Sequence, residues 1–308
     1  SVGRLADTPT GTEWNEGKQL ARDITDANFV GIFGYEMTWS NGLGHINTFN
    51  TPGYQARTQS DYSAYSTALQ NYYAELKTVP TSISQFNHPG TTFGDFSDFA
   101  HYDEEIDQLI TLIEVGNGEG AIGSSGYFPS YEYYTRALDK GWHVAPSNNQ
   151  DNHKGGWGTA NTGRDVVLVD ELSEDAIYDA MRNYRVYATE DLNLEIYYTF
   201  DGNIMGAILG ADSYVSGDSA EISVALNDPN DEGATVEVIV NGGKSLQSKS
   251  VSGNGTVTFT VENPGDYSYY YIRVTQDDGD IAVTAPVWVG TVEAVGITSL
   301  TAEKAITV

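Results

Sequence analysis

Residues 60–90, SDYSAYSTALQNYYAELKTVPTSISQFNHPG, contain the pattern that decides the fold: a helical segment, then a strand, then a polar loop. Apolar side chains recur three and four positions apart in residues 60–78, which predicts an amphipathic helix. The apolar run 83–86 predicts a strand that ends at the loop 87–90. The apolar stripe of the helix consists of Tyr65, Leu69, Tyr72, Tyr73 and Leu76.

The same alternation of strands and helices extends over residues 1–190. Short apolar runs at 29–33, 109–115 and 166–169 predict further strands. A helix is expected to end at Gly141, a residue suited to a left-handed cap, and another to begin after the N-cap Ser173. Repeated strand and helix units indicate an α/β domain with mainly parallel strands.

Beyond residue 190 the apolar pattern changes to a period of two. Gly, Asn, Asp and Pro clusters separate these alternating runs, which predicts an antiparallel β-sandwich of the immunoglobulin-like type over residues 191–292. Residues 293–308 read as a linker or the start of a further β module. The runs are LEIYYTF, AEISVAL, ATVEVIVN, GTVTFTV, YSYYYIRVTQ and APVWVGT.

Composition excludes several classes of protein. The 308 residues carry 43 acidic and 15 basic side chains, a net charge of −28, which repels nucleic acid and acidic membrane surfaces. There is no cysteine, so disulfides and thiolate metal sites are excluded. No apolar run is long enough to span a membrane. The abundance of Tyr, Asn, Thr, Ser and Gly with few lysines favours an extracellular or cell-surface location.

Three of the five histidines follow strand-like runs in polar or glycine-rich loops. These are His45 in GHIN, His88 in FNHPG and His153, which lies two residues after Asp151. Loops after parallel strands converge at one face of a sheet, so these groups and Glu36 are predicted to form a site for Zn, Mn or Fe. The alternative for each motif alone is an ordinary turn.

The other two histidines are assigned structural roles. His101 opens the acidic stretch HYDEEID, and His143 lies in the strand-like segment GWHVAP, where a partly buried, hydrogen-bonded imidazole is expected.

The order of motifs resembles the polymerase and histidinol phosphatase (PHP) superfamily, and most of all its carbaryl-hydrolase-like (CehA/McbA) branch. The resemblance covers about residues 12–206. It implies a distorted (β/α)7 barrel with a metal cluster at its mouth and phosphoesterase or related hydrolase chemistry. The motifs are GYEMTW, GHINTFNT, ISQFNHPG, LIEVGNG, ALDKGWHVAPSNNQDNH and LSEDAIYDAMRNYRVYAT, in this order.

The resemblance also implies individual ligands. Glu36 matches the glutamate that bridges two metals, and His45 and His88 match histidines of the second metal. Asp151 and His153 match paired ligands near the end of the barrel. Among these, Glu36, His88 and Asp151 are the implied catalytic residues.

Two further residues are candidates for the surroundings of the site. Glu114, in LIEVGNG, is expected to support the ligands or, alternatively, to lie in water at a strand end. Arg164, in NTGRD, is expected to meet an anionic substrate or, as the favoured alternative, to pair with a carboxylate.

One departure from the family is expected to limit metal binding. The family opens with a His-x-His strand and an Asp-His strand, and no two histidines here are two residues apart. We expect these strands to belong to an upstream N-terminal segment that was cleaved or omitted. The chain alone is then expected to hold at most one ion, and up to three with that segment as partner.

Two classes of function remain after these considerations. The first is a secreted or surface-displayed metal-dependent hydrolase that acts on a small phosphorylated or ester substrate. The second is a non-catalytic structural, adhesive or filament-forming surface protein with a vestigial PHP site. Either could form a homo-oligomer or polymer.

Overall fold

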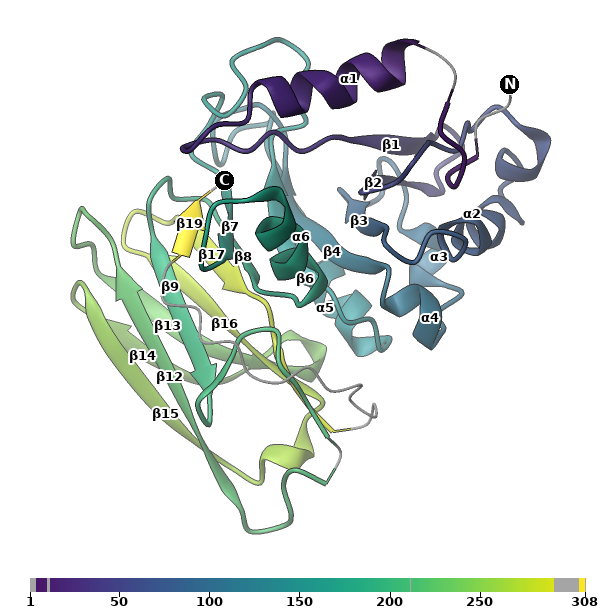
Figure 1. Ribbon diagram of the computed structural model, residues 1–308. Helices are drawn as coiled ribbons and strands as arrows, with labels where there is room; N and C mark the ends of the chain where they lie inside the picture. The colour runs from purple at the N-terminus through teal and green to yellow at the C-terminus, as the bar shows by residue number, and fades with distance from the viewer. Residues whose placement is uncertain (1–3, 10–11, 211, 291–304, 308) are drawn as a thin grey trace.

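The computed structural model describes residues 4–9, 12–210, 212–290 and 305–307, which form three β-sheets and a set of short helices (Figure 1). No helix in these residues is long and apolar enough to cross a membrane. The described helices are α1 Thr12–Asp23, α2 Ala68–Leu76, α3 Phe96–Phe99, α4 Glu104–Asp107, α5 Tyr131–Asp139 and α6 Glu174–Arg182, with the 3₁₀ turns η1 Ser60–Tyr62, η2 Asn241–Gly243 and η3 Pro264–Asp266.

The first sheet has the order β1-β2-β3-β4-β5, with β6 paired to β4. The pairs β1/β2 and β2/β3 are antiparallel, whereas β3/β4 and β4/β6 are parallel. Helix α1 lies beside β1, with the rings of Trp14 and Tyr35 5.9 Å apart (Figure 1). The strands are β1 Gly34–Trp39, β2 Gly44–Phe49, β3 Ile83–Asn87, β4 Ile110–Asn117, β5 Phe128–Pro129 and β6 Ala145–Asn149.

The predicted distorted (β/α)7 barrel is wrong, because the described strands form three sheets, two mixed and one antiparallel, and no such barrel. The physical reason begins at the turn 40–43, which leaves four residues between β1 and β2. A parallel pair needs a crossover of about a dozen residues or more, so this link dictates an antiparallel hairpin. Gly42 takes the left-handed conformation that the turn requires, at φ +81°. Residues 29–33, also predicted as a strand, are not one.

The other two sheets contain the strands from the second half of the chain. Their facing sides pack together: the Tyr198 hydroxyl on β9 donates to the Tyr270 carbonyl on β16 at 2.9 Å, and the rings of Phe200 and Tyr270 are 4.9 Å apart. The four-stranded sheet contains β9 Glu195–Phe200, β10 Asn203–Ile204, β12 Ser219–Asn227 and β15 Gly255–Glu262. The nine-stranded sheet contains β7 Arg164–Leu168, β8 Val186–Thr189, β11 Ile208–Leu209, β13 Ala234–Val240, β14 Lys244–Val251, β16 Tyr269–Gln276, β17 Ile281–Thr284, β18 Val287–Val289 and β19 Ala305–Thr307.

The nine-stranded sheet contains strands from both sides of residue 191, the predicted start of the immunoglobulin-like sandwich. Strand β17 pairs antiparallel with β8, with Ala282 opposite Thr189, so the nine-stranded sheet continues across residue 190. The strand β14 was also missed, because its sequence KSLQSKSV is polar and mostly exposed and lacks alternation. Of the predicted linker or β module 293–308, the part outside 305–307 lies beyond the described residues, and β19 pairs with β7.

Local signals predicted α5 and α6, whereas α2 is shorter than the helix expected over residues 60–78. In α2 the predicted stripe is buried, except that Tyr65 precedes the helix and is 51% exposed. Gly141 follows α5 at φ +96°, as expected for a left-handed cap. The Ser173 hydroxyl accepts a hydrogen bond from the Ala176 amide at 3.2 Å at the start of α6, which satisfies one of the free N–H groups there.

Asn148 joins the first sheet to the nine-stranded sheet. Its side-chain amide donates to the Thr189 carbonyl on β8 and to the Tyr127 hydroxyl, each at 3.1 Å. Its backbone N–H donates to the carboxyl group of Asp165 on β7. These bonds connect β6 to two strands with which it shares no ladder. Burial raises the pKa of Asp165 to about 7.

We predict that Asp165→Asn stabilises the protein at neutral pH and leaves it unchanged near pH 4. Folded Asp165 keeps its proton up to about pH 7, whereas an unfolded Asp releases it near pH 3.9, so unfolding becomes easier as pH rises across this window. The stability difference between variant and wild type should grow by about 3 kcal/mol between pH 4 and 7, measured by urea unfolding. The exposed Asp170→Asn is the control; equal slopes for both variants would contradict the prediction.

Candidate metal centre

Three of the predicted ligands meet at one end of the first sheet. Glu36 lies on β1 and His45 on β2, while His88 directly follows β3. The Glu36 Oε1 atom is 3.3 Å from Nδ1 of His45 and 3.5 Å from Nε2 of His88. One potential ligand atom from each residue lies within 4.8 Å of the others. Two imidazoles and one carboxylate thus form a compact donor set.

Strand register places these side chains together. Thr38 on β1 is opposite His45, and Glu36 lies two residues before Thr38 on the same face, diagonal to His45. His45 is in turn opposite Asn87 on β3. The Asn87 amide donates to Oε1 of Glu36 at 2.9 Å, which orients the carboxylate toward the histidines.

Glu114 fixes the backbone of His88. His88 has φ +27°, outside the strand conformation, and its N–H donates to Oε2 of Glu114 on β4. The Glu114 side chain is buried, 2% exposed, and also accepts from Nδ2 of Asn149 at 2.9 Å and Nδ2 of Asn117 at 3.1 Å. A buried carboxylate with several donors holds the turn that presents His88.

The two carboxylates differ in their electrostatics. Burial opposes ionisation of Glu36, but hydrogen bonds from His45, His88 and Asn87 outweigh it and hold the pKa of Glu36 well below its usual range. Burial raises the pKa of Glu114 well above its usual range, although the His88 and Asn149 donors act against this. Glu36 is therefore an anion at neutral pH, as a metal ligand must be.

The donor set fits a divalent metal ion. Nδ1 of His45 and Nε2 of His88 both face Oε1 of Glu36, at 3.3 Å and 3.5 Å, so each imidazole turns one nitrogen toward the same carboxylate oxygen. Imidazole and carboxylate are donors for Zn, Fe and Mn, and two histidines with one glutamate also occur in catalytic zinc sites.

The three side chains line an open cavity of about 580 Å³. Phe93 forms part of its wall, with its ring 4.5 Å from that of His88 and 5.1 Å from that of His45. Arg57 also lines this cavity, as do Asp151 and His153. The cavity leaves space beside the donor set for water and a small substrate.

Asp151 and His153 reach the cavity but not the compact donor set. The Asp151 Oδ1 atom is 3.7 Å from Nδ1 of His153, and the His153 side chain is 77% exposed. Asp151 has φ +44°, a left-handed conformation at the start of the loop after β6. The structure places this pair on the cavity wall, apart from Glu36, His45 and His88.

The remaining sequence candidates have other partners. Glu114 supports His88, as described above. Arg164 donates to the carbonyls of Gly158, Asn161 and Gly163 and forms no carboxylate pair within the described residues. His143 is buried and its Nδ1 lies 2.6 Å from Asp107 Oδ2, as expected for a structural imidazole.

Sequence reasoning missed Phe93 and Arg57. Phe93 follows the NHPG loop by three residues, and its proximity to a predicted ligand was a usable signal. Arg57 lies in an irregular segment between β2 and η1, where neither spacing nor periodicity gives its direction.

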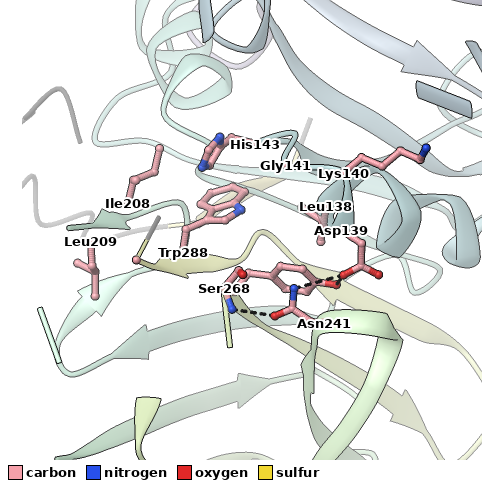
Figure 2. Close-up of a pocket in the computed structure, with 12 residues that line it drawn as sticks. Leu138, Asp139, Lys140, Gly141, His143, Ile208, Leu209, Asn241, Ser268 and Trp288 are labelled. Atoms are coloured by element: carbon pink, nitrogen blue, oxygen red, sulfur yellow. Dashed lines mark hydrogen bonds between the residues drawn. The ribbon is translucent and has the colours of Figure 1, made fainter. Parts of the chain in front are cut away.

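A second cavity of about 240 Å³ lies where α5 meets β11, η2, β16 and β18 (Figure 2). Asp139 in its wall accepts hydrogen bonds from the Tyr269 hydroxyl at 2.8 Å and from the backbone N–H of Gly242. Asn241 Oδ1 accepts from the Ser268 amide at 2.7 Å. These polar groups satisfy one another's hydrogen-bonding capacity. We therefore interpret this cavity as part of the packing interface between these elements.

Comparisons with known proteins give little further information. No protein-family model and no curated protein matches the chain. The chain is similar to a crystal structure from Bacteroides vulgatus ATCC 8482 of a two-domain protein that contains a predicted PHP-like metal-dependent phosphoesterase. The match covers 89% of this chain and 79% of that chain, with 14% identity and a TM-score of 0.39. At this score the likeness does not establish a shared fold.

We predict that the chain binds one equivalent of Zn²⁺ or Mn²⁺ and that His88→Ala weakens binding by at least about a hundredfold, because one of three protein ligands is lost. Isothermal titration calorimetry measures both quantities. The matched control is His101→Ala, since His101 lies outside the cavity and its Nδ1 contacts Gln70. Two or more tight equivalents, or equal affinity of both variants, would contradict this assignment.

A second prediction concerns Glu114, which touches the metal ligands only through the His88 backbone. Glu114→Gln puts an amide N–H₂ among donors that need acceptors, so metal affinity should fall by about tenfold, in the range found for groups that orient ligands. The same titration measures this loss, and circular dichroism confirms that the variant is folded. Unchanged affinity in a folded variant would show that the His88 turn forms without Glu114.

Proposed function

We propose that the chain is a metal-dependent hydrolase of the phosphoesterase type, acting on a small phosphorylated or ester substrate. The observation that carries this proposal is the Glu36, His45 and His88 donor set at the wall of an open cavity. Three protein ligands beside open space are typical of catalytic rather than structural metal sites. The motif order that resembles the CehA/McbA branch of the PHP superfamily supports the same chemistry.

A divalent cation in this site would lower the pKa of a bound water and offset negative charge on the phosphoryl oxygens. Glu36, His45 and His88 would hold it, and Zn, Mn and Fe are the metals that suit these donors. Asn87 keeps the Glu36 carboxylate oriented, and Glu114 keeps the His88 backbone in its turn. Phe93 packs on both imidazoles.

The proposal also includes two residues that lie apart from Glu36, His45 and His88. Asp151 and His153, on the cavity wall, are proposed as further ligands when an upstream N-terminal segment completes a cluster of up to three ions. We also propose that the hydrolase acts outside the cell or at its surface, alone or as a homo-oligomer.

The alternative function is a non-catalytic structural, adhesive or filament-forming surface protein with a vestigial site. The position of Asp151 and His153 outside the compact donor set favours it. The hydrolase is preferred because the ordered support of the ligands by Asn87 and Glu114 has no use in a protein that binds no metal.

Hydrolysis of a chromogenic phosphodiester, bis(p-nitrophenyl) phosphate, distinguishes the two functions. With added Mn²⁺ or Zn²⁺ the wild-type chain should release p-nitrophenol, and a chelator should stop the reaction. His88→Ala should reduce kcat/KM by at least about a hundredfold, whereas His101→Ala should leave it within about twofold. Absence of turnover by a metal-loaded, folded wild-type chain would favour the vestigial site.

A further inference from the structure

We infer that Arg57 forms an anion-binding subsite beside the metal centre and restricts the substrate to esters with a negatively charged phosphoryl group. This inference rests on the proposed function and adds to it the charge of the substrate. Arg57 lines the same cavity as Glu36, His45 and His88.

The position of Arg57 follows from its contact with β1. Its Nη1 donates to the Thr38 carbonyl at 3.2 Å and also to the Thr38 hydroxyl. Thr38 is opposite His45 across the β1/β2 pair. Directly opposed residues in a sheet have Cβ atoms about 5 Å apart. The guanidinium group is therefore bound to Thr38, the residue directly opposite the candidate ligand His45 on the neighbouring strand.

The donors of Arg57 suit an oxyanion. Within the described part of the chain, its hydrogen bonds use Nη1 alone, and it forms no ion pair with a carboxylate. The Nε and Nη2 groups remain for a ligand, in the planar fork that matches two oxygens of a phosphoryl group. The hydroxyls of Ser40 and Thr92, also at the cavity wall, supply further hydrogen-bond donors.

Charge favours the same substrate. The chain has a net charge of −28, which repels anions in general. Inside the cavity, the carboxylates of Glu36 and Asp151 together balance a divalent cation, and the ligating imidazoles are neutral. When the charge of Arg57 is added, the cavity has a net charge of about +1. A phosphoryl anion is attracted there, whereas a neutral ester gains nothing from this charge.

The test compares an anionic and a neutral substrate in the metal-loaded protein. Bis(p-nitrophenyl) phosphate and p-nitrophenyl acetate share a leaving group and differ in charge. Arg57→Gln should lower the ratio of kcat/KM for the phosphodiester over the acetate by about ten- to a hundredfold, mainly through KM, as expected for a lost charge-assisted contact. Arg57→Lys should recover part of it, because it restores charge without the fork.

Arg22→Gln is the matched control, since it removes one positive charge from an exposed position on α1 and should leave the ratio unchanged. Equal losses on both substrates in Arg57→Gln would make Arg57 a structural residue and overturn the inference, and so would an unchanged ratio.

Calorimetric binding of inorganic phosphate separates this inference from the proposed function. If wild-type protein hydrolyses neither ester but binds phosphate about tenfold more tightly than Arg57→Gln, the hydrolase proposal fails and the anion subsite stands. If hydrolysis is present and phosphate affinity is the same in both, the hydrolase stands and the subsite fails.

Discussion

The four-residue turn between β1 and β2 is the constraint on which the metal centre depends. Its length forces an antiparallel hairpin, and the hairpin register places Glu36 diagonal to His45. Pairing of β2 with β3 then sets Asn87 opposite His45, so His88 emerges beside both. A slip by one residue would move Glu36 to the other face of the sheet, because side chains alternate. Register thus determines whether the site exists at all.

The segment that follows Phe93 contains strained backbone. Residues 96–99 all have positive φ between 54° and 62°, a left-handed turn that side chains disfavour. The Arg136 guanidinium pairs with Asp95 at 3.1 Å and with Asp98 at 2.5 Å, which holds this turn in place. Phe96 covers Gly44, where a Cβ would meet the ring at 2.3 Å. Strain of this kind persists only where surrounding contacts enforce it, and here it shapes the segment that follows Phe93.

The grouping of Glu36, His45 and His88 was easier to predict from the sequence than the fold was. A glycine-punctuated segment separates Glu36 from His45, and His88 lies between Asn87 and Pro89; these local signals do not depend on sheet topology. The direction of a strand does depend on sheet topology. The short Asn-Gly link at residues 40–43 was a signal in the sequence that favoured an antiparallel hairpin over a parallel barrel. Phe93 and Arg57 escaped detection, and the sequence left Glu114 between two roles, because tertiary contacts determine what these side chains do. The burial of Glu114 and the direction of Arg57 are set by neighbours distant in sequence, which no spacing reveals.

Hydrogen bonds connect the metal centre to the C-terminal strands, so the two are not independent. Strand β17 pairs with β8 at Thr189, whose carbonyl accepts from Asn148 on β6. The next residue, Asn149, donates to Glu114, and Glu114 accepts from the backbone of His88. Each link is a hydrogen bond of partly or fully buried groups, where a missing partner is costly. The strands beyond residue 190 therefore help to set the position of a candidate metal ligand, in addition to packing against one another.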